Sequence, residues 1–450
     1  MKKVEKRAIM CLLLGLFLIA GVGFFVYEDW SEGADWVVYE GNRDVFADGD
    51  LAKGGVYDAN GELLMKNTSE GMIFNDSADV RAACLHITGD KDNNIATGAN
   101  RAFLDKLIGY DFINGIYSLN NEGENVTLTI DSDVCATAYN ALAGRKGCVG
   151  VYNYKTGEIV CMVSSPTYDP LNVPYTIPDG AYINRFLDAS FAPGSTFKLV
   201  TAAASIENLD DAYSFHVNCT GSVDYGHGDE VTDISAHGDV TLTKALEVSC
   251  NCYFGKLTEK LGPGLMEKYV EKTGLNKSYD IDGIDTKAGT FDYPDSGVNL
   301  AWTGIGQYHD MVNPCSMMVY MGAIAGNGTA VLPTIMSPAN FIEENIDKAK
   351  TAILKTEDMI DESTASSLRD MMRNNVENHY GGDGAFPGLE LCAKSGTAEV
   401  AGQTKPNAWF TGFIDDEDNP YAFVVLVENA GYGSDVAGDV ANKVLQDIVN

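Results

Sequence analysis

The stretch FAPGSTFKLVTAAASIE, residues 191–207, decides how this sequence is interpreted. Pro193 and Gly194 introduce it, and the alanine-, leucine- and valine-rich run that follows predicts a helix of about a dozen residues. Ser195 and Lys198 are three residues apart, so they lie on one face of that helix, near its first turn. The N–H groups of a first turn are unpaired, and the helix dipole there favours negative charge. The lysine amine is therefore placed to activate the serine as a nucleophile, although an isolated match is more simply a capping serine and a solvated lysine.

A second triplet, Ser249-Cys250-Asn251, lies inside a helical pattern that covers residues 241–261. Ser249 is suited to relay a proton, and Asn251 is suited to hold a substrate amide. The S-x-N spacing is weak evidence by itself. It recurs at residues 118–120, with nothing catalytic around it.

A third group, Lys394-Ser395-Gly396-Thr397, lies on a predicted strand. A strand edge can pair with an extended peptide, and a glycine lets that peptide come close. The lysine and the two hydroxyls are suited to bind a carboxylate. Residues 155–157 also match K-[ST]-G, but they precede Ser195 and are predicted to form the tip of a hairpin.

The ordered set S-x-x-K, S-x-N and K-[ST]-G resembles the motifs of penicillin-binding proteins and serine β-lactamases. Longer stretches are more specific and resemble class B penicillin-binding proteins. These stretches are residues 151–170, 191–207, 237–262, 304–318, 393–399 and 408–413. KGGVYDANG, residues 53–61, resembles the start of the family's N-terminal pedestal, although Lys53 and Ala59 replace its usual arginines. In 304–318, Tyr308 and Asn313 replace a usual glycine and threonine.

The resemblance implies a serine acyl-enzyme mechanism on peptidoglycan stem peptides. Ser195 would attack the penultimate D-alanine carbonyl, and Lys198 would act as its base. Ser249 would pass the proton to the leaving amine, and Asn251 would orient it. The N–H groups of Ser195 and Thr397 would form the oxyanion hole. The substrate carboxylate would lie against the catalytic Lys394 and the substrate-binding residues Ser395, Gly396 and Thr397.

An amine from a second stem peptide would then resolve the acyl-enzyme and make the cross-link. β-Lactams would acylate the same serine and inhibit the enzyme. The resemblance also implies a polytopic glycan polymerase of the membrane as a partner. It implies no cofactor and no metal.

Composition and charge limit the classes of protein to which this chain can belong. The 450 residues include 64 acidic and 31 basic ones, for a net charge of −33, which argues against a nucleic-acid partner. Hydrophobic residues make up 45% of the chain, enough for a packed core. The spacing of the ten cysteines contains neither a C-x-x-C pair nor a zinc pattern, so most are expected to be buried free thiols. They are Cys11, Cys84, Cys135, Cys148, Cys161, Cys219, Cys250, Cys252, Cys315 and Cys392.

An uncharged apolar run at residues 8–27 is long enough to cross a bilayer. The basic tail 1–7 before it predicts a cytoplasmic N-terminus and an extracytoplasmic catalytic domain in a single-pass membrane protein. A cleaved signal peptide is the alternative, but that run ends in bulky residues, which do not suit cleavage. We expect a stalk and pedestal over 28–145 and the transpeptidase domain over 146–450.

The predicted fold is α+β, with a small mixed pedestal and one antiparallel sheet flanked by helices in the larger domain. In the pedestal we expect two strands within 51–65, a strand at 126–130 and a helix at 132–142 capped by Asp131. The stalk, 28–49, is expected to be irregular. The predicted strands of the larger domain are 148–154, 158–164, 390–397, 407–415 and 420–428, with a final helix at 435–449.

Other activities on the same fold stay open at this level. A D,D-carboxypeptidase would differ only in using water as the acceptor. A class A β-lactamase needs a deacylating glutamate that is not recognisable here, and a class D enzyme has S-x-V in place of S-x-N. A non-catalytic scaffold or a β-lactam sensor is disfavoured because all the expected catalytic side chains are present.

Overall fold

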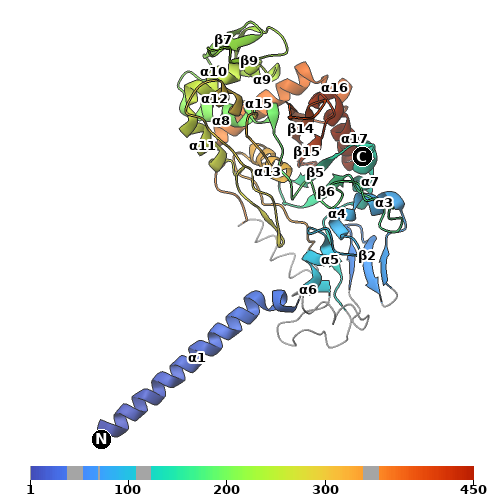
Figure 1. The fold of residues 1–450 in the computed structure, drawn as a ribbon, viewed down its shortest axis with the longest axis vertical. Coiled ribbons are helices and arrows are strands. Elements are labelled where there is room, and N and C mark those ends of the chain that lie inside the picture. The colour runs from blue at the N-terminus through green and yellow to red at the C-terminus, as the bar shows by residue number, and fades with distance from the viewer. Residues whose placement is uncertain (1, 38–53, 69–70, 108–122, 338–353) are drawn as a thin grey trace.

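A long N-terminal helix, a small sheet and a larger mixed domain follow one another along the chain (Figure 1). The computed structural model describes residues 2–37, 54–68, 71–107, 123–337 and 354–450. Helix α1, Lys2–Val37, projects from the end of the molecule that carries the small sheet. Its segment Lys3–Glu28 is exposed, and it is long and apolar enough to span a membrane. The prediction of an irregular stalk is wrong for residues 28–37, which continue helix α1, since no proline interrupts it there. Residues 38–49 lie outside the described residues.

The small sheet has the strand order β3-β2-β1-β4. Its strands are β1 (Gly55–Tyr57), β2 (Leu63–Thr68), β3 (Gly71–Phe74) and β4 (Val126–Thr127). β1 and β2, the two strands expected near 51–65, pair antiparallel around Gly61, whose φ of 82° suits a tight turn. The predicted strand 126–130 is shorter than expected, since the pairing with β1 ends at Thr127; the Leu128 N–H still donates to the Tyr57 carbonyl at 2.8 Å while Leu128 bridges Met336 on its other side. The chain between β3 and β4 contains the short helices α3 (Ala78–Ala83), α4 (Leu85–Thr88), α5 (Ala99–Ala102) and α6 (Leu104–Leu107).

The large sheet confirms the predicted fold class. Its order is β13-β14-β15-β5-β6, and every neighbouring pair is antiparallel. Its strands are β5 (Gly147–Asn153), β6 (Ile159–Ser165), β13 (Leu391–Ala398), β14 (Asn407–Ile414) and β15 (Tyr421–Val427). All five lie within a residue or two of the predicted strands. Strand β13 is an edge of this sheet.

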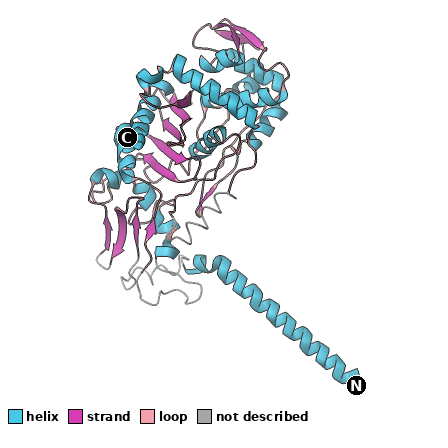
Figure 2. Ribbon diagram, turned by 180° about the vertical axis from the view of Figure 1, so that it is seen from behind, coloured by secondary structure: helices cyan, strands magenta, loops and turns pink. Residues whose placement is uncertain are grey.

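Helices cover the large sheet on both sides (Figures 1 and 2). α13 (Pro314–Ala325) is buried along its whole length and packs against β14, β15 and β5. α7 (Ser132–Leu142) and α17 (Gly438–Val449) pack together on the other side. Asp131 caps α7 as predicted, accepting hydrogen bonds from the backbone N–H groups of Asp133 and Val134. A π-helical turn over Gly433–Ala437 precedes α17.

A helical region with short strand pairs lies at the end of the molecule far from α1 (Figure 1). Its helices are α8 (Lys198–Asn208), α9 (Leu242–Glu247), α10 (Asn251–Leu261), α11 (Pro263–Lys272), α12 (Val298–Thr303), α15 (Glu362–His379) and α16 (Gly382–Ala385). Its two-stranded pairs are β7 (His216–Cys219) with β10 (Gly238–Thr241) and β8 (Ser222–Asp224) with β9 (Glu230–Thr232). A third pair, β11 (Asp280–Ile281) with β12 (Ile284–Asp285), lies nearer the small sheet, because Asp282 in its turn accepts from the N–H groups of Ile335 and Met336.

The predicted continuous helix over 241–261 is wrong in its middle. The chain breaks between α9 and α10, where Ser249 has a φ of 56°. That left-handed conformation is uncommon for residues other than glycine and ends the helical hydrogen bonding. The break turns Ser249 from a residue inside a helix into the corner of a turn.

Candidate active site

The predicted nucleophile Ser195 lies in a short 3₁₀ turn, η2 (Gly194–Thr196), that leads into α8. The N–H of Gly194 donates to the carbonyl of Gly306 at 2.8 Å. A Cβ on Gly194 would lie 2.8 Å from the carbonyl oxygen of Thr397. The serine therefore lies where the segment around Gly306 meets the end of β13, which brings the first and third motifs together.

The predicted base Lys198 is fully buried. Its Nζ donates to the Ser249 carbonyl at 2.6 Å, to the Ser249 Oγ at 3.2 Å and to the Asn251 Oδ1 at 2.7 Å. These three acceptors use all three donors of an ammonium group. In the described part of the chain the Ser195 hydroxyl therefore makes no hydrogen bond to it, and the direct contact expected from their spacing is not formed. Catalytic hydrogen bonds are often loose before substrate binds.

The predicted third-motif lysine, Lys394, is also fully buried and lies on the other side of Ser249. Its Nζ donates to the Ser249 Oγ at 3.1 Å and to the Ser395 carbonyl at 3.1 Å. One hydroxyl thus lies between the two lysine amines. The phenol of Tyr380 binds the Ser395 Oγ at 3.0 Å and accepts from the Ser395 N–H at 3.0 Å. Nothing in the sequence pattern indicated this tyrosine, which follows α15.

The electrostatics of the two lysines favour a neutral amine at the site. Burial, together with the nearby charge of Lys394, lowers the pKa of Lys198 to about 7. Burial likewise lowers the pKa of Lys394 to about 7. Two ammonium groups that share one hydroxyl in a dry site repel each other, so their titrations are coupled. Near neutral pH the pair therefore favours one proton over two, which leaves one amine able to act as a base.

The turn that holds Ser249 depends on a loop far away in the sequence. The Asp233 Oδ2 accepts from the N–H of Asn251 at 2.8 Å and from that of Cys252 at 3.4 Å, at the start of α10. The Asn251 Nδ2 donates to the carbonyl of Thr232 at 2.9 Å. These contacts fix the backbone N–H and the side-chain Nδ2 of Asn251, and its Oδ1 accepts from Lys198. Sequence reasoning missed Asp233, which carries no local motif.

Strand β13 packs tightly against the nucleophile segment. A Cβ on Gly396 would lie 2.7 Å from the Pro193 carbonyl oxygen and 2.9 Å from the Thr196 Cγ2. The indole of Trp409, on β14, donates to the carbonyl of Ala192 at 2.9 Å. The approach is possible only because residue 396 has no side chain. Hydrogen bonds thus join Lys198, Ser249, Asn251, Lys394 and Ser395. The neighbours of Ser195 in the nucleophile turn approach Gly396 and Thr397 closely, which brings that turn against β13.

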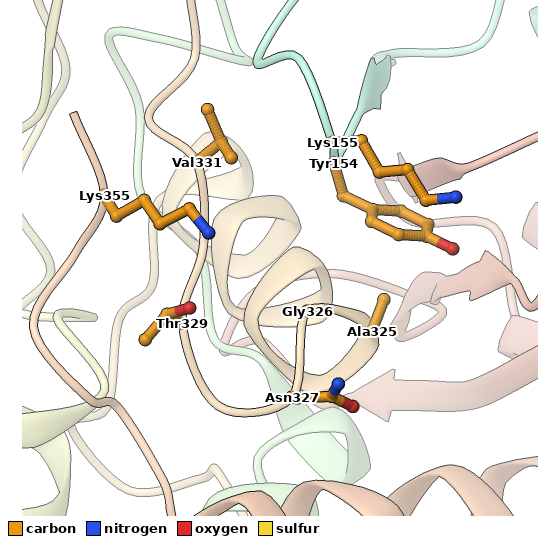
Figure 3. A pocket seen from close by; sticks show the side chains of 8 residues that line it. All are labelled: Tyr154, Lys155, Ala325, Gly326, Asn327, Thr329, Val331 and Lys355. Atoms are coloured by element: carbon orange, nitrogen blue, oxygen red, sulfur yellow. The ribbon is translucent and has the colours of Figure 1, made fainter. Parts of the chain in front are cut away.

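The two additional sequence matches, K-[ST]-G at 155–157 and S-x-N at 118–120, are not part of this site. Residues 155–157 form the turn between β5 and β6, as predicted, and 118–120 lie outside the described residues. Figure 3 shows a separate pocket of about 250 Å³ beside that turn. None of the predicted site residues lines it. Its lining residues are Tyr154, Lys155, Ala325, Gly326, Asn327, Thr329, Val331 and Lys355.

Comparison with known proteins agrees with this arrangement. Residues 147–446 match the penicillin binding protein transpeptidase domain. The peptidoglycan D,D-transpeptidase PbpA of Mycobacterium tuberculosis is 26% identical over 398 residues, 79% of this chain and 78% of that protein. A ceftriaxone acyl-enzyme of penicillin-binding protein A from M. tuberculosis superposes with a TM-score of 0.77 at 20% identity, covering 90% of this chain and all of that one. A D,D-transpeptidase domain from Eggerthella lenta gives 0.75 at 25% identity, covering 89% and 98%. The chain belongs to the penicillin-binding protein transpeptidase family, and the predicted class B membership fits these relatives.

Proposed function

We propose that this chain is a peptidoglycan D,D-transpeptidase that works through an acyl-enzyme on Ser195 and is inhibited by β-lactams. The observation that carries the proposal is the single hydroxyl of Ser249 held between two buried lysines with lowered pKa values, beside the nucleophile turn. The D,D-transpeptidase activity in the name of the mycobacterial relative and the acyl-enzyme captured in its structure support the same chemistry.

Acylation follows from these positions. The neutral amine of Lys198 takes the proton of the Ser195 hydroxyl as the Oγ bonds to the penultimate D-alanine carbonyl carbon. Backbone N–H groups of Ser195 and Thr397 hold the resulting oxyanion. The proton then passes from Lys198 through the Ser249 Oγ to the amine of the terminal D-alanine. The C–N bond breaks, and that D-alanine leaves.

Deacylation runs the same path in reverse. The amine of a second stem peptide attacks the ester carbon and loses a proton towards Ser249 and Lys198. The ester C–O bond breaks, Ser195 regains its proton, and a new peptide bond joins the two stems. Lys394, Ser395 and Thr397 hold the donor carboxylate, and the β13 edge with Gly396 aligns the donor peptide backbone.

The N-terminal helix would anchor the enzyme in the membrane and so determine on which side the reaction takes place. We propose that residues 8–27 cross the membrane, that residues 1–7 are cytoplasmic, and that the pedestal over 28–145 raises the transpeptidase domain, 146–450, outside the cell. A polytopic glycan polymerase, bound through the anchor and the pedestal, would supply the nascent strands. A cell-surface protease test on intact cells that leaves the catalytic domain uncut would contradict this orientation.

Labelling of the detergent-purified full chain tests the chemistry. Fluorescent penicillin should acylate wild-type protein, and peptide mapping should place the adduct on Ser195. Ser195→Ala should lose the label, whereas Ser316→Ala, a buried serine on α13, should keep it. Incubation with a donor ending in D-alanyl-D-alanine and an amino acceptor should yield the transfer product. A label that persists in Ser195→Ala would refute the nucleophile, and release of D-alanine with hydrolysis alone would indicate a carboxypeptidase.

A further inference from the structure

Three buried cysteines meet where the chain between β3 and β4 packs against the large sheet. Cys84 lies between α3 and α4, Cys135 is on α7, and Cys161 is on β6. α7 packs against both α3 and β6 (Figure 1), and the Asn140 Nδ2 of α7 donates to the Asp79 Oδ2 of α3 at 3.1 Å. All three cysteines are free thiols, and none is more than 1% exposed.

Their sulfur atoms form a thiol row, Cys84–Cys135–Cys161, with Cys135 in the middle. The Cys161 thiol and the Cys84 thiol both hydrogen-bond to the Cys135 sulfur. Cys84 acts on Cys161 as a more distant charge. The backbone fixes one side of the row, because the Asp131 N–H at the start of α7 donates to the Val160 carbonyl of β6 at 2.9 Å. Thiols this close can be joined by an S–S bond of about 2.05 Å after small side-chain rotations.

The thiol row differs from a cysteine that only fills space in the core. The Cys315 thiol on α13 is of that second kind, since burial alone raises its pKa. In the thiol row, hydrogen bonds from Cys161 and Cys84 lower the pKa of the Cys135 thiol, and the pKa values of both donors are raised. Cys135 therefore ionises before its neighbours. The thiolate is the form that attacks a disulfide.

We propose that the thiol row is an exchangeable disulfide site, in which Cys135 bonds to either Cys84 or Cys161 and the third cysteine stays reduced. The bond to Cys84 would tie the chain between β3 and β4 to α7, and the bond to Cys161 would tie α7 to the large sheet. The extracytoplasmic orientation proposed above puts the site in the compartment where disulfides form. The inference goes beyond the transpeptidase activity and uses none of its steps.

Oxidation of the site needs a disulfide from outside the protein, either a low-molecular-weight disulfide or a thiol–disulfide oxidoreductase. The Cys135 thiolate attacks one sulfur of that disulfide, forms a mixed disulfide and releases one thiol. The thiolate of Cys84 or Cys161 then attacks the Cys135 Sγ, and the second half of the oxidant leaves as a thiol. Two protein thiols are thus oxidised, and one disulfide is reduced to two thiols. Local opening of the packed helices gives the oxidant access.

Exchange within the thiol row needs no further oxidant. The thiolate of the third cysteine attacks the Cys135 Sγ, and the existing S–S bond breaks. The displaced cysteine leaves as a thiolate and takes up the proton that the attacking thiol lost. The number of disulfides stays the same, so the staple moves from one side of α7 to the other.

Non-reducing peptide mapping of the full-length chain, purified in detergent, tests the proposal. The chain is equilibrated with oxidised glutathione, quenched with acid, denatured and blocked with N-ethylmaleimide before digestion. We expect about one disulfide per chain in the thiol row, with the Cys135 peptide joined to that of Cys84 or Cys161 and the remaining thiol alkylated. Cys315→Ala, which removes a buried thiol of α13, is the matched control and should keep this pattern.

Substitutions within the thiol row separate its two states. Cys161→Ala should form only the bond to Cys84, Cys84→Ala only the bond to Cys161, and Cys135→Ala neither. The oxidised wild type should unfold about 5 °C or more above the reduced chain, and Cys135→Ala should lose that difference. Ser195→Ala should keep the disulfide pattern while losing the penicillin label, so failure of this site and failure of the proposed activity are distinguishable.

The wild-type map needs no substitution, so it decides the proposal even if a variant fails to fold. Recovery of Cys135 as an alkylated thiol after oxidation would overturn it, because every disulfide of the thiol row includes that residue. A direct bond between Cys84 and Cys161, in the wild type or in Cys135→Ala, would contradict the order of the three sulfurs. Absence of the expected bond in either Cys84→Ala or Cys161→Ala would show that the site does not exchange.

Discussion

The two sides of the active site are built in different ways. On one side, Lys394 to Thr397 lie on β13, a regular strand paired along its length with β14. On the other, Ser249 occupies a left-handed turn between two helices, held by Asp233 and Thr232 from a distant loop. The site residues of the strand side are consecutive in the chain and belong to one regular strand. The turn side exists only when contacts between separate segments form. Substitutions on the strand side should therefore change individual contacts of the site directly. Substitutions on the turn side should act by changing the conformation of the turn.

The largest expected effect is at Lys198, where the two sides meet. Lys198→Arg keeps a cation but cannot release a proton, so penicillin acylation should fall by about 10²–10⁴-fold, as far as in Lys198→Ala. Lys394→Arg should be milder, because a cation still faces the carboxylate. Stopped-flow acylation rates for the three variants would decide this. Near wild-type rates in Lys198→Arg would mean that Lys198 acts only as a charge.

The pH dependence of the acylation rate also tests whether a lysine acts as the base. Both lysines have pKa values lowered to about 7, so below that pH both are protonated and neither can accept the serine proton. Acylation should therefore rise as the pH increases through about 7, and fall again where the second proton of the pair is lost. In Lys394→Ala the falling limb should disappear. A wild-type rate that does not change between pH 5 and 9 would contradict a lysine base.

The packing of the strand side is tested at Gly396. In Gly396→Ala the new Cβ would lie 2.7 Å from the Pro193 carbonyl, so β13 or the nucleophile turn must shift. We expect acylation to slow by roughly tenfold or more and stability to fall by about 1–3 kcal/mol. Gly264→Ala, in α11 with no atom within 4 Å of the added Cβ, is the control and should be neutral or stabilising. Equal effects of both substitutions would refute the close approach.

A smaller effect is expected at Tyr380. Tyr380→Phe removes the phenol that binds the Ser395 hydroxyl and N–H, a loss of about 1–2 kcal/mol. We expect weaker donor binding, seen as a rise in KM for a D-alanyl-D-alanine peptide of about five- to thirty-fold, with kcat little changed. Tyr432→Phe, at an exposed tyrosine, is the control. A fall in kcat alone would place Tyr380 in the chemical step instead.

The same division separates the features that the sequence predicts from those that it does not. The strands of the large sheet, the Asp131 cap and the hairpin tip at 155–157 depend on neighbouring residues, and the structure has them where they were expected. The break at Ser249, the missing contact between Ser195 and Lys198, and the role of Asp233 depend on residues far apart in the chain. No local pattern contains that information, so these features emerge only from the fold.

The smallest expected effect tests a feature that is purely local. In Asp131→Ala, α7 loses the carboxylate that accepts from the N–H groups of Asp133 and Val134, at a cost of about 1 kcal/mol in unfolding free energy. Asp133→Ala, an exposed residue of the same turn, should cost less, because its side chain caps no N–H group. Chemical denaturation would measure both. The acylation rate should be unchanged in either variant, since α7 lies across the sheet from the helices that carry the site. A slower rate in Asp131→Ala would show that the capped helix is coupled to the catalytic turn, and that local features also shape the site.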